Sequence, residues 1–165
     1  MKLLFLKGRL AKKGWEYRDS FPYHLPQYVL IAGPHTSWRD FFVALCVRED
    51  LGLHDIKFLG KHSLFWWPLG NLLRALGGIP VNRASTHGVV DQMAEHIASN
   101  PSFKLGLAPE GTRSKVQGLK SGYRNIAEKA GVPIVTLGMD FGRKVISVAQ
   151  PFAATSSETD DGHVL

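Results

Sequence analysis

Cysteine is nearly absent from the sequence, because Cys46 is the one thiol among 165 residues. A lone cysteine cannot form an internal disulfide, and it cannot build a cysteine-based metal cluster. The seven histidines are scattered, and the His-Glu-x-x-His pattern of many zinc enzymes does not occur. We therefore expect no metal site and a fold that depends on its hydrophobic core.

Long apolar runs are also missing. No stretch approaches the roughly 18 to 20 apolar residues that a helix needs to cross a bilayer. The short apolar run Leu3–Leu6 lies between lysines and lacks a small-residue cleavage site, so no signal peptide is expected. Gly60-Lys61 resembles the end of a nucleotide-binding loop, but Asp55 stands where such a loop needs a glycine. With 44% hydrophobic and 21% charged residues, the composition is that of a globular domain with one substantial core.

The net charge of +6 is unevenly distributed. Residues 1–18 hold six cationic side chains and one acidic one, a net charge of +5, interleaved with leucines and aromatic residues. This combination suits an amphipathic segment that binds the cytoplasmic side of a membrane peripherally. An ordinary packed first helix with solvated lysines is the alternative. Phe65, Trp66 and Trp67 are further candidates for membrane contact, or equally for the core, because tryptophan is highly buried on average. Nucleic acid is not an expected partner, because no recognition motif accompanies the basic segment.

Short apolar runs alternate with longer helical patterns along the rest of the chain. Strands are expected at residues 28–32, 56–59, 79–81, 103–108, 133–137 and 145–148, and helices at 41–51, 63–76, 88–98 and 123–130. Pro68 is expected to interrupt the second helix. The alternation predicts a single layered α/β domain with a mostly parallel central sheet flanked by helices. Residues 1–20 are interpreted as a basic N-terminal segment, 21–153 as the domain and 154–165 as a polar C-terminal tail.

A histidine and an aspartate follow the first predicted strand of this domain. Active sites in open α/β sheets lie at the carboxyl ends of strands, and His35 and Asp40 come directly after the strand 28–32. Five residues of ideal helix leave two side chains about 140° apart. The pair can therefore meet only if His35 precedes the helix and Asp40 lies in its first turn. A carboxylate so placed would orient a general base. Ser37 and Asp40 also have the spacing of a helix capping box, so Asp40 has a structural alternative role.

Polar clusters follow two further predicted strands. Arg83 comes after the third strand, and residues 109–114, with Glu110, a glycine and Arg113, come after the fourth. Arginine is suited to bidentate recognition of phosphate. A surface salt bridge is the ordinary explanation for one arginine. Three polar clusters, each at a strand end, favour a shared site.

Four blocks stand in order along the sequence: His35-Thr-Ser-Trp-Arg-Asp40, Gly78-Ile-Pro-Val-Asn-Arg83, Pro109-Glu-Gly-Thr-Arg-Ser114 and Val132-Pro-Ile-Val135. They resemble the four blocks of the glycerol-phosphate and lysophosphatidic acid acyltransferases, the first of which is a His-x4-Asp block. Their order and their spread over residues 35–135 make the resemblance specific. Between the first two blocks, Lys61 begins a stretch similar to the family's lysine followed by apolar residues and a proline.

The resemblance implies an enzyme of phospholipid biosynthesis. It would move a fatty acyl group from acyl-CoA or acyl carrier protein to the hydroxyl of a lysophosphatidic acid-like acceptor in the membrane. His35 would take the hydroxyl proton, and Asp40 would orient the imidazole. The acceptor would be bound by Lys61, Arg83, Glu110, Gly111, Thr112 and Arg113. No tightly bound cofactor is implied, because the acyl donor is a co-substrate.

The residues around His35 bear on the type of reaction. Apart from Ser37, no serine or cysteine stands near His35, and no Gly-x-Ser-x-Gly elbow occurs. Direct attack by the acceptor is therefore simpler than a covalent intermediate.

Three positions depart from the family's pattern. Pro34 replaces a frequent asparagine, Ala108 a usual phenylalanine and Thr136 a common proline. These changes leave open a lipid acceptor without phosphate. A membrane-binding relative without activity is the other alternative, against which the intact pair of His35 and Asp40 argues.

Overall fold

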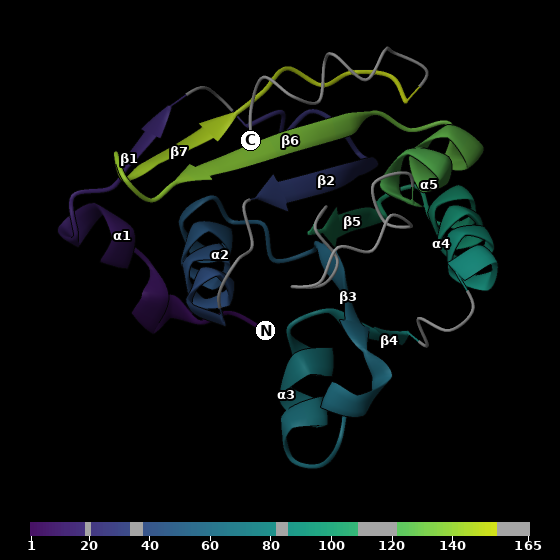
Figure 1. The fold of residues 1–165 in the computed structure, drawn as a ribbon, viewed down its shortest axis with the longest axis horizontal. Coiled ribbons are helices and arrows are strands. Elements are labelled where there is room, and N and C mark those ends of the chain that lie inside the picture. The colour runs from purple at the N-terminus through teal and green to yellow at the C-terminus, as the bar shows by residue number, and fades with distance from the viewer. Residues whose placement is uncertain (19–20, 34–37, 82–85, 109–121, 155–165) are drawn as a thin grey trace.

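A seven-stranded sheet runs through the computed structural model, which describes residues 1–18, 21–33, 38–81, 86–108 and 122–154 (Figure 1). The strands are β1 (Glu16–Arg18), β2 (Tyr28–Gly33), β3 (Lys57–Lys61), β4 (Gly78–Val81), β5 (Lys104–Leu107), β6 (Ile134–Asp140) and β7 (Val145–Val148). Their order in the sheet is β1-β7-β6-β2-β5-β3-β4, and only the β6–β7 pairing between these strands is antiparallel. The predicted α/β fold with a mostly parallel sheet is confirmed.

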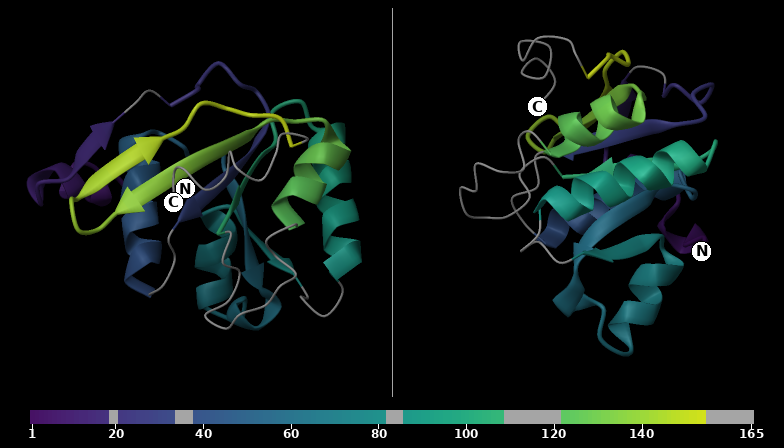
Figure 2. Two further views of the ribbon diagram at one scale, coloured as in Figure 1. Left: turned by 45° about the horizontal axis from the view of Figure 1, so that its top comes forward. Right: turned by 90° about the vertical axis from the view of Figure 1, so that its right-hand side faces the viewer.

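Helices cover both faces of the sheet. They are α1 (Arg9–Lys12), α2 (Trp38–Asp50), α3 (Leu69–Ala75), α4 (Thr86–Ser99) and α5 (Gly122–Ala130), with short 3₁₀ turns η1 (Leu4–Leu6) and η2 (His62–Leu64). The N-terminal elements and α2 pack on one face, while α4 and α5 lie side by side on the other (Figures 1 and 2). Successive residues of β2 alternate between the two cores, with Leu30 in the first and Val29 and Ile31 in the second. A parallel strand covered on both faces must be apolar throughout, as β2 is.

The elements expected from the sequence all form, with shifted ends. The helix expected at 41–51 is α2, which begins at Trp38. The helix expected at 63–76 forms as two separate pieces, η2 and α3. The interruption lies at Pro68, as expected, where the Trp67–Pro68 peptide bond is cis. The strand β1 was not predicted from the sequence. Its three residues are too few to show a recognisable alternation of apolar and polar positions, and its strand geometry comes from pairing with β7.

The N-terminal segment is packed into the domain. Leu6 and Leu10 are buried in the core that α2 covers. The carboxylate of Asp50, at the end of α2, accepts hydrogen bonds from the Gly8 amide at 2.5 Å and from the Tyr17 hydroxyl at 2.6 Å. Burial and the hydrogen bond to Asp50 together raise the pKa of Tyr17. Leu6 and Leu10 therefore follow the packed alternative, whereas Leu4, Phe5 and the cationic side chains of residues 1–18 are exposed.

Thr136 offers a test of how the sheet interior is stabilised. It lies in β6 opposite Ile31, is 1% exposed, and its hydroxyl has no hydrogen-bond partner among the described residues. A buried hydroxyl without a partner costs about 1–3 kcal/mol. Thr136→Val should therefore raise the free energy of unfolding by about 1 kcal/mol in urea denaturation. Thr136→Ser keeps the hydroxyl and should not stabilise. A less stable valine variant would mean that the hydroxyl is satisfied.

Candidate functional site

The carboxyl ends of four adjacent parallel strands form one edge of the sheet. In the order β2, β5, β3 and β4, these strands end at Gly33, Leu107, Lys61 and Val81. Each end leads directly into, or is itself, a segment that the sequence singled out. The first block follows β2, the third follows β5, Lys61 ends β3, and Arg83 follows β4. The strand order therefore starts all four predicted segments from neighbouring positions on one edge.

Part of the predicted site lies outside the described residues. This applies to His35, Arg83, Glu110, Gly111, Thr112 and Arg113, and to Pro34 among the departures from the family. Asp40 and Lys61 are the predicted site residues whose surroundings are described. Their placement is therefore the direct structural information on the site.

Asp40 is a buried residue in the first turn of α2. Its exposed fraction is 4%, whereas the next two residues, Phe41 and Phe42, are 36% and 51% exposed. A carboxylate is placed in the interior only when it has a partner, and Asp40 is engaged in an interaction. The spacing of His35 and Asp40 requires Asp40 to lie in the first turn of the helix that follows β2. Asp40 does lie there, in the first turn of α2. A carboxylate held in this way can orient a base or cap the helix.

Lys61 ends β3 and is exposed beside Val81, its partner in β4. Because β3 lies between β5 and β4, Lys61 stands between the two strand ends that lead to Arg113 and Arg83. Exposure at a strand end leaves its ammonium group in water. Lys61 is thus placed where an anionic ligand at this edge would meet it.

Phe65, four residues after Lys61, packs against the strands β3 and β4, a structural role that the sequence analysis did not predict. It is 8% exposed, so the suggestion that it contacts a membrane is wrong. Its ring fills the space over Gly60 and Gly78, where an added Cβ would approach ring carbons to 2.7 and 3.1 Å. A Cβ at Gly70 would come within 2.3 Å of the Phe65 carbonyl oxygen. Packing against Phe65 therefore explains the glycine at position 78, the first residue of the second block. In the sequence, the glycines at positions 60, 70 and 78 were the only indication that Phe65 is buried.

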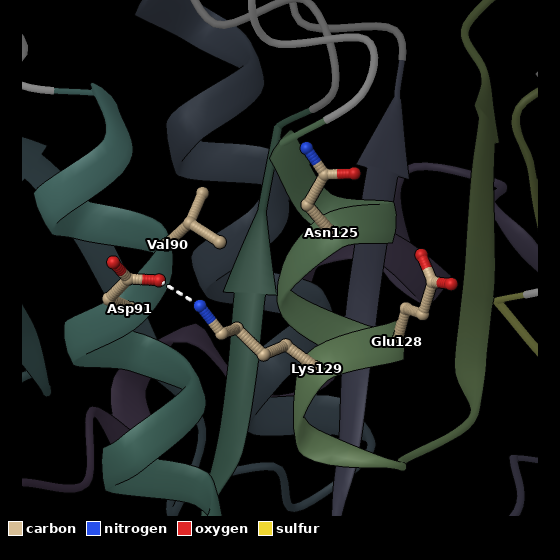
Figure 3. A pocket seen from close by; sticks show the side chains of 5 residues that line it. All are labelled: Val90, Asp91, Asn125, Glu128 and Lys129. Carbon is tan, nitrogen blue, oxygen red and sulfur yellow. Dashed lines mark hydrogen bonds and ion pairs between the residues drawn. The ribbon is translucent and has the colours of Figure 1, made fainter.

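A hollow of about 370 Å³ lies away from these residues, between α4 and α5 (Figure 3). It is lined by Val90, Asp91, Asn125, Glu128 and Lys129. Asp91 and Lys129 point toward each other and form an ion pair, and both are more than half exposed. An exposed pair of this kind contributes little to stability or binding. Neither Asp40 nor Lys61, the two predicted site residues that the structure describes, lines the hollow, and we assign it no function.

Comparison with known proteins adds a family match. A family model described as Acyltransferase matches residues 18–140, which is more than half of the chain and includes all four blocks. Neither the curated proteins nor the solved structures gave a match.

Proposed function

Because this chain belongs to the acyltransferase family, we propose that it transfers a fatty acyl group from an acyl thioester to a lysophosphatidic acid-like lipid. The observation that carries the proposal is the strand order β2-β5-β3-β4. It starts the segments of His35, Arg113 and Arg83, together with Lys61, from one edge of the sheet. A base and several cations in segments that begin at the same edge of the sheet suit a substrate that has both a hydroxyl and a phosphate.

The chemistry requires one proton acceptor and no covalent enzyme intermediate. His35 takes the proton of the acceptor hydroxyl as the oxygen attacks the thioester carbonyl carbon. The tetrahedral intermediate then expels the thiolate, which takes the proton back from the imidazolium, and the products are an ester and a free thiol. Asp40 stabilises the imidazolium, and its burial strengthens this effect because charges interact more strongly away from water.

The cations account for the choice of acceptor. Lys61 is exposed at the end of β3, between the strand ends that lead to the two arginines. Three cations around one phosphate would supply charge-assisted hydrogen bonds, which are stronger than neutral ones. Thr136, in contrast, is too deeply buried to contact a lipid acceptor, so this departure from the family pattern gives no support to a remodelled pocket. Ala108, at the end of β5, is half-buried and could border the acceptor.

The test is a substrate panel with the purified full-length protein. Acyl-CoA and acyl-carrier-protein donors are combined with lysophosphatidic acid, glycerol 3-phosphate and monoacylglycerol, and the products are identified by mass spectrometry. We expect a new ester from lysophosphatidic acid and poor reaction of monoacylglycerol. A preference for monoacylglycerol would refute the phosphate assignment. The absence of any ester with all pairs would favour a non-catalytic lipid-binding relative.

A further inference from the structure

Exposed apolar side chains are concentrated in the connection between β3 and β4. Within residues 62–75, which we call the tryptophan turn, Trp66 and Trp67 are 61% and 78% exposed. Leu64 and Leu72 are nearly half exposed as well. Figure 1 shows that α3 and the turn before it project away from the sheet. Such a group of large apolar side chains marks a surface that another molecule covers.

The exposure of the two tryptophans is built into the turn. Phe65, directly before them, is buried, and the Arg74 guanidinium lies 5.3 Å from the centre of its ring. The Gly70 amide donates a hydrogen bond to the Trp66 carbonyl at 2.6 Å. The space for Phe65 exists only because Gly70 carries no Cβ. Of these three consecutive aromatic residues, Phe65 is therefore buried, while Trp66 and Trp67 are exposed to solvent.

The charge around the tryptophan turn is of one sign. Residues 56–90 contain no Asp or Glu and include four cationic residues, Lys57, Lys61, Arg74 and Arg83. Of these, Lys57, Lys61 and Arg74 are exposed in the structure. The tryptophan turn therefore presents aromatic rings together with cations, and the segment 56–90 to which it belongs contributes no acidic side chain that would repel an anionic surface.

The N-terminal segment extends this surface. The amino group of Met1 donates a hydrogen bond to the Ala75 carbonyl at the end of α3, at 3.0 Å. The N-terminus consequently lies beside α3, as Figure 1 shows. Leu4 and Phe5 are 68% and 69% exposed, and the neighbouring lysines are exposed too. The excess charge of residues 1–18 therefore begins next to the tryptophan turn.

We propose that the tryptophan turn docks the protein onto an anionic lipid bilayer, with Trp66 and Trp67 at the level of the headgroups. Tryptophan suits this depth because its ring is apolar while its N–H can donate to water or to a headgroup. The cations attract anionic lipids over a short range. No helix among the described residues has the length and apolar character to span a bilayer, and docking of this kind needs none. Since Lys61 immediately precedes the tryptophan turn, docking would also bring the candidate site close to lipid, a consequence that rests on the proposed function.

The experiment measures binding of the full-length protein to phosphatidylcholine vesicles with and without phosphatidylglycerol. Wild-type protein should co-sediment with the anionic vesicles and be released by salt, because salt screens the headgroup charge. The double variant Trp66→Ala/Trp67→Ala should bind about tenfold more weakly or worse, since two large apolar side chains are removed. It should also lose the blue shift of tryptophan fluorescence on vesicles, although Trp15 and Trp38 remain.

A matched control variant shows whether the loss of binding is specific to the tryptophan turn. Phe141→Ala removes an aromatic side chain that is 38% exposed, outside the tryptophan turn, and should bind vesicles as the wild type does.

Equal binding by the double tryptophan variant, or no binding by wild-type protein, would overturn the proposal. So would a wild-type dimer in analytical ultracentrifugation that the double variant abolishes, because a second copy would then be the occupant. Turnover of a water-soluble short-chain acceptor should be unchanged in the double variant. If wild-type protein binds vesicles but transfers no acyl group, docking stands and the proposed function fails.

Discussion

His35→Ala should lower the rate of acyl transfer by about 10² to 10⁴-fold, because a general base contributes a factor of this size. Under the proposed mechanism the loss should appear mainly in kcat, because removing the imidazole would leave the contacts to the acceptor's phosphate in place. Transfer is measured with purified protein and the best substrate pair of the panel, and folding is checked by circular dichroism. Near-normal turnover in a folded variant would remove His35 from the mechanism.

Two further variants separate catalysis from structure. Asp40→Asn preserves the shape of a residue that is 4% exposed but removes its charge, so the imidazole would lose its orienting partner and most of the activity should disappear. If Asp40 only serves in the capping box, the asparagine variant should keep its activity, because asparagine retains a side-chain oxygen that can accept a backbone N–H hydrogen bond. His24→Ala is the matched control, since His24 is exposed and precedes β2, at the opposite end of that strand from His35.

Lys61→Met should raise the KM for lysophosphatidic acid by roughly one to two factors of ten, as expected when a charge-assisted hydrogen bond of about 1.5–3 kcal/mol is lost. The KM for the acyl donor should change far less, because the proposal assigns the three cations to the acceptor's phosphate. Arg83→Met and Arg113→Met should behave in the same way if the three cations share one phosphate. Steady-state kinetics with each substrate varied in turn gives both constants.

The same strand supplies a matched control for this experiment. Lys57 is exposed on the same face of β3 as Lys61 but at the start of the strand, away from the carboxyl edge. Lys57→Met should leave the acceptor KM unchanged, and monoacylglycerol should be a poor substrate that is indifferent to all four variants. Normal acceptor kinetics in Lys61→Met, Arg83→Met and Arg113→Met would disprove the phosphate assignment while leaving the role of His35 intact.

The sequence could place His35, Asp40, Arg83, Glu110 and Arg113 at strand ends because they follow apolar runs. Lys61 and Thr112, and the roles of all these residues in acyl transfer, came from the resemblance to the acyltransferase family. Apolar runs are recognisable one at a time, from local periodicity. Periodicity assigns a residue to a face of its own element, but it does not name the neighbouring element. That limit explains β1, whose three residues form a strand only through pairing with β7. It also explains why the burial of Phe65 was not predicted. Phe65 resembles its exposed neighbours Trp66 and Trp67 in the sequence, and only the structure shows that glycines far apart in the chain pack against it.

By itself, the sequence determined the α/β class, the positions of the main strands and helices, the concentration of charge in residues 1–18, and the four blocks of the candidate site. These properties depend on the identity and spacing of residues close together in the chain. Only the tertiary structure decided that β5 lies between β2 and β3, so that the strand that precedes the third block pairs with the strand that precedes the first. It also decided that Asp40 turns inward while Trp66 and Trp67 remain in water. The physical reason is that strand pairing and burial depend on contacts between residues far apart in sequence, which no local pattern specifies.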